Sequence, residues 1–313
     1  MMRRLRSEPL EGEVALVTGG SRGLGFLIAR ELIAAGCRVA ICGRDAEALA
    51  SAKDELGDVL AIECDVSKKD EVEAMIAQIV ARFGRIDILV NNAGIIQGGP
   101  LESMHEHDFE LSMGVMYWGV LYPTMAALPH MRRRGRGRIA NVTSIGGKVA
   151  LPHVLPYSSA KFAAVGFSEA LHAEVAKDGI SVTTIVPGFM RTGGYMNALF
   201  KGQQMKEYAL FSVTSNLPLI SMDAERAARR IVTAIRRRET EVILTLPAKL
   251  GTLVHGVFPG LTSDFFALMT RLLPKHDGPP NENVRGEDAD EALDSDLHRA
   301  ATRLGRTAAE RFQ

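Results

Sequence analysis

The strongest constraint on the fold is an alternation that runs from Val14 to Leu246. Short, almost continuously apolar runs rich in β-branched residues alternate with longer amphipathic runs. A strand that is apolar on both faces must be covered on both faces, as in a parallel sheet between two layers of helices. The pattern therefore predicts an α/β fold with a parallel central sheet.

Seven of the short apolar runs are predicted to be strands. They are residues 13–18, 38–42, 59–65, 85–94, 138–144, 180–188 and 241–246. Between them, residues 24–36 and 69–84 show helical spacing, and each of these runs ends in a glycine. Because crossovers between parallel strands are right-handed, this order predicts a doubly wound, Rossmann-like sheet in a single domain.

The sequence changes character after Leu246. Residues 261–273 carry an apolar stripe at helical spacing, and 276–291 are polar and rich in Pro and Gly, which is typical of a linker. One further amphipathic helix is expected from the spacing of Leu293, Leu297, Ala300 and Leu304. We interpret this part as a helical C-terminal extension. The expected organisation is an N-terminal segment 1–12, a main α/β domain 13–250 and the extension 251–313.

Composition excludes several classes of function. Lys and Arg together number 37, as do Asp and Glu, so the formal net charge is zero and gives no electrostatic case for a nucleic-acid partner. Cys37, Cys42 and Cys64 are odd in number and fall in predicted core segments, which favours reduced thiols in a cytoplasmic protein. The chain lacks an uninterrupted apolar run of about 20 residues, so a transmembrane span is not expected.

Two polar features have simple interpretations. The arginine-rich run 132–138 lies between a predicted helix and a predicted strand, where it is typical of a solvated turn. His105, His107 and His153 have no partners at metal-ligand spacing. We therefore predict no metal site.

A glycine-rich turn, TGGSRGLG at 18–25, follows the first predicted strand and opens a helix. Glycines at 19, 23 and 25 would let backbone N–H groups approach a pyrophosphate at the positive end of the helix dipole. Such a turn could also be a structural loop, but its position between a strand and a helix favours a dinucleotide site. The domain 13–250 is thus expected to bind a dinucleotide.

The end of the second predicted strand bears on which dinucleotide binds. A preference for NAD calls for a carboxylate there, but the sequence has Gly43 followed by Arg44. Arg44 and Arg22 would together pair with the 2′-phosphate of NADP, so NADP is favoured over NAD. Asp45 is expected to cap the next helix. The alternative is that Arg44 is a solvated surface arginine.

Two further strand ends are expected to meet the cofactor. Asp65 and Val66 close the third strand, where the adenine ring would lie. The run NNAG at 91–94 closes the fourth, where small residues let the chain pass close to the cofactor, although a tight turn explains it equally well.

Taken together, these motifs resemble the short-chain dehydrogenase/reductase family. TGGSRGLG, NNAG, Ser144, the run YSSAK from Tyr157 to Lys161, and Pro187-Gly188 occur in the order and at the separations usual for it, over about Val14 to Thr192. The resemblance implies NAD(P)-dependent chemistry on alcohols and carbonyls. The complete set of candidate cofactor-binding residues is Gly19, Ser21, Arg22, Gly23, Leu24, Gly25, Arg44, Asp65, Val66, Asn92, Ala93, Gly94, Tyr157, Lys161, Pro187, Gly188 and Thr192.

The chemistry of Tyr157 and Lys161 supports the same interpretation. Reduction of a ketone needs a proton for the developing alkoxide, and a free tyrosine has a pKa of about 10. An ammonium about 4 Å away contributes about 4 kcal/mol at an effective dielectric near 20, and the i, i+4 spacing predicts that Lys161 lies beside Tyr157. We expect Tyr157 to act as acid/base, Lys161 as its electrostatic partner, and Ser144 as the clamp on the substrate oxygen. The resemblance implies a second role for Lys161, on the nicotinamide ribose.

One position departs from the family pattern. Related sequences carry an asparagine where this chain has Met116, in the run MYWGV. A thioether cannot replace an amide in a proton relay. Besides an NADP(H)-dependent oxidoreductase, the sequence therefore leaves open a noncatalytic regulatory or scaffold protein that binds NADP(H).

The segment 187–202 is expected to form a lid near the substrate. By resemblance, Thr192 would contact the carboxamide of the cofactor. An apolar pocket wall is expected from Phe189, Met190, Tyr195, Met196 and Phe200. The apolar stripe at 261–273 could pack as core, which is the simplest interpretation, form a subunit interface, or lie near a membrane surface. With the lid, it favours a lipophilic carbonyl or alcohol substrate. A homo-oligomer is also expected.

Overall fold

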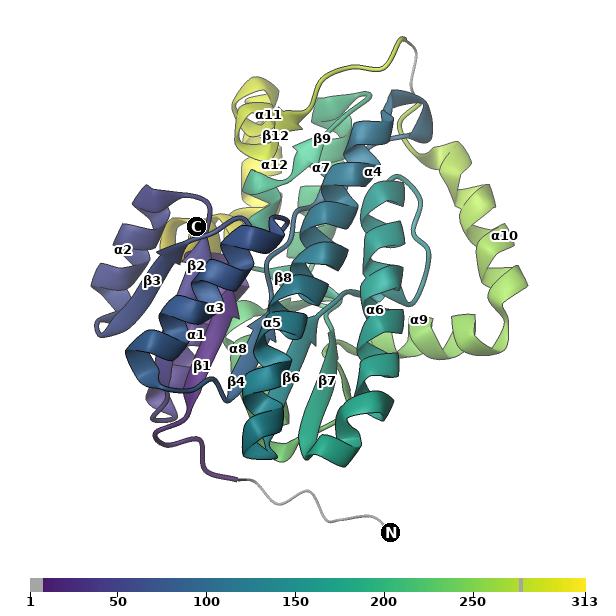
Figure 1. Cartoon of the computed structure of the whole chain (residues 1–313). Helices are drawn as coiled ribbons and strands as arrows, with labels where there is room; N and C mark the ends of the chain where they lie inside the picture. The colour runs from purple at the N-terminus through teal and green to yellow at the C-terminus, as the bar shows by residue number, and fades with distance from the viewer. Residues whose placement is uncertain (1–7, 276–277) are drawn as a thin grey trace.

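A seven-stranded parallel sheet forms the centre of the protein (Figure 1). The computed structural model describes residues 8–275 and 278–313. The strand order is β11-β7-β6-β4-β1-β2-β3. Their bounds are β1 Val14–Thr18, β2 Arg38–Gly43, β3 Val59–Glu63, β4 Ile88–Asn91, β6 Gly137–Val142, β7 Ile180–Val186 and β11 Glu241–Ile243. The Rossmann-like sheet predicted from the sequence is confirmed.

Alternate residues of each strand enter different hydrophobic cores. Ala15 and Val17 of β1 belong to the core under one layer of helices, whereas Val14 and Leu16 belong to the core under the other. Since every residue of β1 is buried, the strand has to be apolar throughout, which is why its sequence shows no alternation. The first layer contains α1 Gly23–Ala34, α2 Ala46–Leu56 and α8 Ala224–Arg237, and the second contains α3 Lys69–Phe83, α5 Gly119–Arg134 and α6 Leu155–Val175.

The helical run before β6 is long and continuous. It comprises α4 Glu106–Met113, the π-helical turn η2 Gly114–Trp118 and α5. Among the described residues, this run alone is long and apolar enough to cross a membrane. Half of its most apolar stretch is buried inside the protein. That burial is typical of a core helix, and the side of α5 against the sheet supplies Val120, Ala127 and Leu128.

Smaller elements cover the carboxyl edge of the sheet. Short strands form two further sheets, and α7 Gln204–Asn216 packs beside them. The remaining strands are β5 Gln97–Gly98, β8 Phe189–Arg191, β9 Leu199–Phe200, β10 Ser221–Asp223 and β12 Val284–Arg285. Turns of 3-10 helix are η1 Leu101–Ser103, η3 Ile145–Gly147, η4 Ala176–Asp178, η5 Gly194–Asn197 and η6 Thr270–Leu272. Tyr195, Phe200 and Tyr208 form a third, small core in this cap.

Two predictions for the C-terminal extension are wrong. The expected linker 276–291 contains the strand β12 and most of the helix α11 Gly286–Leu293. Its first two residues, 276 and 277, lie outside the described part of the chain. Where the sequence predicted one further helix, the structure has three: α11, α12 Asp296–Ala301 and α13 Arg303–Phe312. Leu297, one of the residues whose spacing predicted the further amphipathic helix, is 83% exposed. The tail instead packs through α11 against α7 and through α13 against α1.

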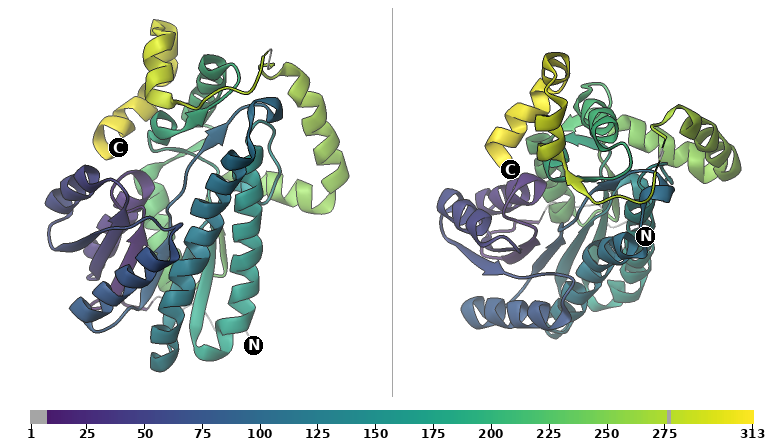
Figure 2. Two further views of the ribbon diagram at one scale, coloured as in Figure 1. Left: turned by 45° about the horizontal axis from the view of Figure 1, so that its top comes forward. Right: turned by 90° about the horizontal axis from the view of Figure 1, so that it is seen from above.

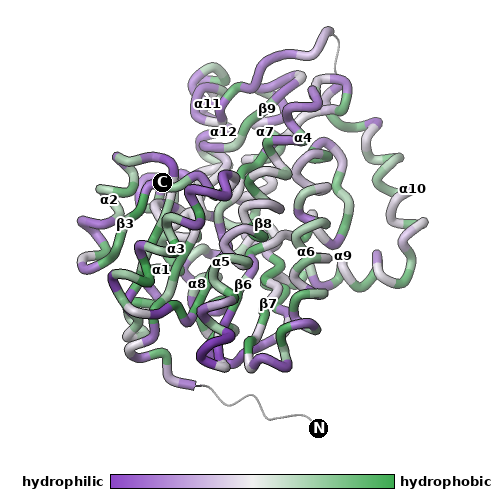
Figure 3. Tube along the Cα trace, in the orientation of Figure 1, coloured by the Kyte–Doolittle hydropathy of each residue, from purple (hydrophilic) through white to green (hydrophobic). Residues whose placement is uncertain are grey.

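Two helices project from one side of the body, α9 Leu246–Val257 and α10 Pro259–Met269 (Figures 1 and 2). The expected boundary at residue 250 falls inside α9. The two helices, which we call the arm, expose large apolar side chains, and the hydropathy colouring shows apolar residues on α10 as well as on the central strands (Figure 3). These exposed residues are Leu246, Leu250, Leu253, Val254, Val257, Phe258, Leu261, Phe265 and Leu268. Core packing of the 261–273 stripe is therefore wrong for this chain.

Candidate active site

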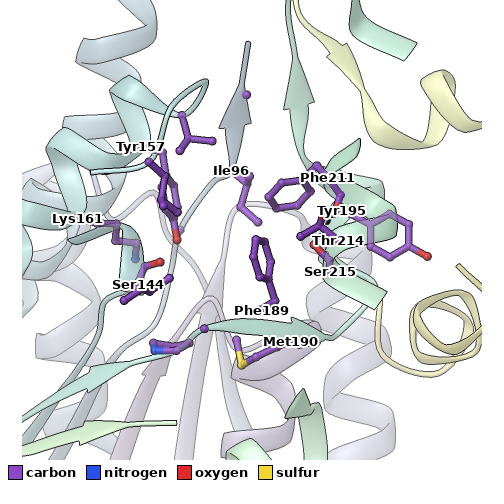
Figure 4. A pocket seen from close by; sticks show the side chains of 18 of the residues that line it. Ile96, Ser144, Tyr157, Lys161, Phe189, Met190, Tyr195, Phe211, Thr214 and Ser215 are labelled. Carbon is purple, nitrogen blue, oxygen red and sulfur yellow. Dashed lines mark hydrogen bonds between the residues drawn. The ribbon is translucent and has the colours of Figure 1, made fainter. Parts of the chain in front are cut away.

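A cavity of about 450 Å³ lies at the carboxyl edge of the sheet, beneath α7 (Figure 4). Ser144, Tyr157 and Lys161 lie on one side of it, facing Ile96, Phe189 and Phe211 on the other. The loops after β1, β4, β6 and β7 all reach it. In open α/β sheets, ligands bind at this edge.

The glycine turn has the close contacts expected of a cradle for phosphate. Gly19 has a φ of +62°, and a Cβ there would lie 2.9 Å from the Cα of Ala93. A Cβ on Gly25 would lie 2.0 Å from the carbonyl oxygen of Gly19. No side chain caps the start of α1, and its first turn contains no acidic residue. The uncapped N–H groups there could donate to a pyrophosphate, and binding of a dinucleotide at this turn stays a prediction.

Hydrogen bonds tie the NNAG run to the glycine turn. Asn92 donates from its side-chain amide to the carbonyl oxygens of Thr18 and Gly19, at 3.0 and 3.1 Å. The backbone N–H groups of Asn92 and Ala93 both donate to the hydroxyl of Thr18. NNAG therefore holds the turn in place, in addition to lining the cavity through Asn92 and Gly94.

The residues expected around the adenosine lie together. Asp45 caps α2 by accepting a hydrogen bond from the N–H of Ala48 at 3.0 Å, as predicted. It also lies 3.6 Å from Arg22, while Arg44 is exposed beside it. A Cβ on Gly43 would meet the hydroxyl of Ser21 at 3.2 Å.

Asp65 and Val66 lie at the end of β3. The carboxylate of Asp65 accepts hydrogen bonds from both the N–H and the hydroxyl of Ser67, and the backbone N–H of Asp65 donates to Glu71. Val66 is buried, and a Cβ on Gly119 would lie 2.6 Å from its methyl group. Both residues thus shape the loop before α3.

The catalytic candidates come from two neighbouring elements. Ser144 follows β6, and its hydroxyl accepts a hydrogen bond from the N–H of Gly146 at 3.0 Å. Tyr157 and Lys161 lie on the first turns of α6, whose start contains Pro156. Burial raises the pKa of Tyr157, and its hydrogen bond with Ser144 opposes that rise.

Lys161 differs from what the sequence predicted. Its ammonium lies 5.9 Å from the centre of the Tyr157 ring and donates to the carbonyl oxygen of Val142 at 3.0 Å. Burial lowers the pKa of Lys161 to about 8. The expected acidification of Tyr157 by this cation is therefore wrong for the protein alone, since the pKa of Tyr157 rises. The physical reason is that burial disfavours both charged forms, and the ammonium donates to the Val142 carbonyl oxygen instead of lying against the phenol oxygen.

Met116 lies beside this site. It is completely buried in η2, and its Cγ lies 3.9 Å from the place that a Cβ on Gly94 would occupy. That Cβ would also lie 3.7 Å from the Nζ of Lys161. Met116, which stands where related sequences have asparagine, thus adds apolar surface next to a buried ammonium. Its thioether offers only a weak hydrogen-bond acceptor.

The lid residues after β7 mostly line the cavity as expected. Pro187, Gly188, Thr192, Phe189, Met190, Tyr195 and Phe200 all do so. Met196 is the exception, because it packs in the small core and contacts the hydroxyl of Tyr208.

Sequence reasoning missed the opposite wall of the cavity. This wall comes largely from α7 and includes Glu207, Leu210, Phe211, Thr214 and Ser215. His153 also lines the cavity, a role that its neighbours in the sequence do not indicate. A helix without strong amphipathic spacing gave no signal that one of its faces would close a pocket.

Comparisons with known proteins show which family the chain resembles. Residues 13–201 match the family model described as short chain dehydrogenase. A "Dehydrogenase/reductase SDR family protein 7-like" from Anopheles gambiae is 34% identical over 255 residues, covering 78% of each chain. "Dehydrogenase/reductase SDR family member 7B" from Danio rerio is 29% identical and covers 89% of this chain and 91% of its own.

A solved structure is similar over most of the chain. It is a short-chain dehydrogenase from Streptomyces avermitilis, with a TM-score of 0.72 and 30% identity, covering 83% of this chain and 98% of the other. The family model spans more than half of the chain, and the fold is similar to that of a solved short-chain dehydrogenase. The chain therefore belongs to the short-chain dehydrogenase/reductase family and is an NAD(P)-dependent oxidoreductase of that family.

Proposed function

We propose that the protein interconverts a carbonyl and a secondary alcohol on a hydrophobic substrate, using NADP(H). The observation that carries this proposal is the convergence of Ser144, Tyr157 and Lys161 in one largely apolar cavity next to the glycine turn. When bound, the nicotinamide cofactor supplies or accepts the hydride.

The protein's own residues would handle the oxygen and its proton. Ser144 and Tyr157 would both hydrogen-bond the substrate oxygen and stabilise the charge that develops on it. Tyr157 would donate the proton in reduction, although burial raises its pKa and so makes it a weaker acid in the protein alone. Lys161 retains N–H groups beyond the one used by Val142, and these would hold ribose hydroxyls of the cofactor.

The preference for NADP rests on the two arginines near the end of β2. Arg44 is exposed, and Arg22 makes a 3.6 Å ion pair with Asp45 in which both side chains are well exposed. Exposed ion pairs are worth at most about 1 kcal/mol, so Arg22 could exchange Asp45 for a phosphate at little cost. No carboxylate stands at the end of β2, because Gly43 is its last residue and Arg44 follows it.

The walls of the cavity support a hydrophobic substrate. Ile96, Phe189, Met190 and Phe211 lie across the cavity from Tyr157 (Figure 4), and Leu210 also lines it. Leu273, which follows the arm and the turn η6, also reaches the cavity. We therefore propose that the arm rests on a lipid surface from which such a substrate enters.

The charges of the arm and of the segment that follows it fit anionic headgroups, because Lys249, Arg271 and Lys275 accompany a single acid, Asp264, between residues 246 and 275. A second copy of the chain is the competing occupant, in keeping with the expected homo-oligomer. The three cysteines are free and buried, which supports a cytoplasmic location.

A turnover screen tests the function. Purified protein is incubated with NADPH and a panel of aromatic ketones, fatty aldehydes and simple ketones, and NADPH consumption is followed. We expect turnover of hydrophobic carbonyls and a loss of about 100-fold or more in kcat for Tyr157→Phe. Tyr122→Phe, on α5 next to Trp118, serves as the matched control.

The noncatalytic alternative predicts a different result. A protein that only senses NADP(H) would bind the cofactor and turn over no member of the panel. Equal rates for wild type and Tyr157→Phe would also contradict the proposed role of the tyrosine. Met116 keeps this alternative relevant, because it removes the amide on which related proton relays depend.

A further inference from the structure

A buried acid–base pair faces the cavity and has no part in the proposed reaction. His153 Nδ1 lies 2.7 Å from Glu207 Oε1, and the two side chains are only 15% and 5% exposed. Both residues line the cavity, His153 from the turn before α6 and Glu207 from the first turn of α7. The pair thus joins the catalytic helix to the opposite wall.

Two features make this pair energetically unfavourable as a purely structural element. Burying a carboxylate and an imidazole removes them from water, and such a pair often contributes less stability than apolar residues of similar size. In addition, His153 has a φ of +60°, in the left-handed region that non-glycine residues seldom adopt. Its carbonyl oxygen accepts a 2.7 Å hydrogen bond from the N–H of Gly99, which holds it there. Backbone strain of this kind is concentrated at ligand sites.

A second buried pair shows what a structural arrangement looks like in the same protein. Asp108 and Lys201 are also 2.7 Å apart and almost completely buried, away from the cavity. Asp108 accepts further hydrogen bonds from the side chain of Gln97 and from the N–H of His105. By contrast, in the described part of the chain the Glu207 carboxylate has a hydrogen-bond partner only in His153. A carboxylate can accept about four hydrogen bonds, so Glu207 retains capacity on the cavity side.

We propose that His153 and Glu207 bind a hydroxyl group of the substrate, separate from the carbonyl that Ser144 and Tyr157 hold. A hydroxyl both donates and accepts, so it could donate to the Glu207 carboxylate and pair with the free Nε2 of His153. An anionic group would be repelled by the Glu207 carboxylate, and an alkyl group would leave that carboxylate with His153 as its partner and its remaining acceptor capacity unused. The substrate class is therefore a hydrophobic ketone or aldehyde that carries an additional hydroxyl. This inference rests on the proposed function.

The test uses substrates that differ only in a hydroxyl. The value of kcat/KM with NADPH is measured for 1-tetralone and for its 5-, 6- and 7-hydroxy derivatives. We expect at least one hydroxylated isomer to be preferred about tenfold or more, since sites built for a hydroxyl reject analogues without it. Glu207→Gln and His153→Asn should each bring the ratio of kcat/KM for the preferred hydroxylated isomer to kcat/KM for 1-tetralone towards one. Asparagine is chosen because it tolerates the left-handed backbone of position 153.

Asp108→Asn is the matched control, because it weakens a buried pair of the same length outside the cavity. It should keep the wild-type preference for the hydroxylated ketone over 1-tetralone, even if it lowers the stability of the protein. The proposal is overturned if wild type treats all four ketones alike, if both pocket variants keep the preference, or if Asp108→Asn abolishes it.

A binding measurement separates this proposal from the proposed function. Dissociation constants of the same four ketones are measured by calorimetry for the NADPH complex of Tyr157→Phe. If no ketone is turned over by wild type but the hydroxylated isomer still binds tighter in a Glu207-dependent way, the proposed function fails and the hydroxyl site stands. Equal binding of all four, or none, rejects the hydroxyl site.

Discussion

Residues 13–201 and residues 202–313 differ in how completely they bury their apolar side chains. In the first region, strands and helices bury them in two cores, and the loops at the carboxyl edge bring Ser144, Tyr157 and Lys161 together. In the second region, α8 and β11 still bury theirs in the first core, and α7 contributes Leu210 and Phe211 to a cavity wall, while α9 and α10 leave theirs exposed. The family model ends at residue 201, and the exposed apolar stretch begins later, at α9. The comparison suggests that the first region performs the reaction and the second selects what reaches it.

The largest expected effect comes from exchanging one glycine in each region. In Gly25→Ala the new Cβ would lie 2.0 Å from a backbone oxygen, so we expect a loss of about 3 kcal/mol or more in unfolding free energy, together with loss of NADPH binding. In Gly256→Ala, on α9, no described atom lies within 4 Å, and a gain of about 0.5–1 kcal/mol is expected. Urea denaturation measures both. Similar effects of the two substitutions would contradict the contrast between the regions.

A second effect concerns the pH dependence of stability. The pKa of Lys161 falls from 10.5 to about 8 in the folded protein. Between these values the unfolded chain holds the proton and the folded chain does not, so this group makes stability rise with pH from about 8 to 10.5. The total is about 3 kcal/mol at 1.36 kcal/mol per pKa unit.

The measurement compares unfolding free energies of the cofactor-free wild type and Lys161→Met across this pH range. The difference between them should change by about that amount, in favour of wild type at high pH. Parallel curves for the two proteins would show that Lys161 is not desolvated as the structure describes.

A smaller effect tests the choice of cofactor. Arg44→Asp should shift the ratio of NADPH to NADH affinity towards NADH by about tenfold or more, the worth of a charge-assisted hydrogen bond. The control is Arg38→Asp, at the opposite end of the same strand, where Arg38 stacks on Phe83. Fluorescence titration of both cofactors gives the ratio. An unchanged ratio in Arg44→Asp would refute the assignment to NADP.

The smallest effect on stability is expected in the arm. Because Phe265 and Leu268 are exposed, replacing both by serine should change the unfolding free energy by less than about 0.5 kcal/mol per residue. The same variant should bind vesicles of phosphatidylcholine and phosphatidylserine more weakly. If it instead changes the sedimentation coefficient and leaves vesicle binding unaltered, a second copy of the chain covers the arm.

The sheet and the catalytic edge could be predicted because their signals are local. Each strand is a short apolar run, and the glycine turn, Asp45 and the Tyr157–Lys161 spacing are fixed by neighbouring residues. The state of Lys161 could not be predicted in this way. Its pKa depends on burial and its ammonium bonds the Val142 carbonyl, 19 positions away, so helix spacing alone predicts the wrong direction for the pKa of Tyr157.

The C-terminal extension was harder to predict for a related reason. The apolar stripe of residues 261–273 has helical spacing in either environment, and spacing does not tell a buried face from an exposed one. Likewise, Leu293 and Leu297 are spaced for one helix, but Asp294 adopts a φ of +36° between them and ends α11. The pairing of His153 with Glu207 links positions 54 apart and left no local pattern.

The wall of the cavity is drawn from positions as far apart as Leu24 and Leu273. During synthesis, the cofactor turn and the central strands would leave the ribosome long before the residues that close the pocket. A nascent chain that has reached residue 201 would contain Ser144, Tyr157 and Lys161 but neither Phe211 nor Leu273. Such an intermediate would hold reactive groups in an open groove, so the ability to choose a substrate would be the last property that this protein acquires.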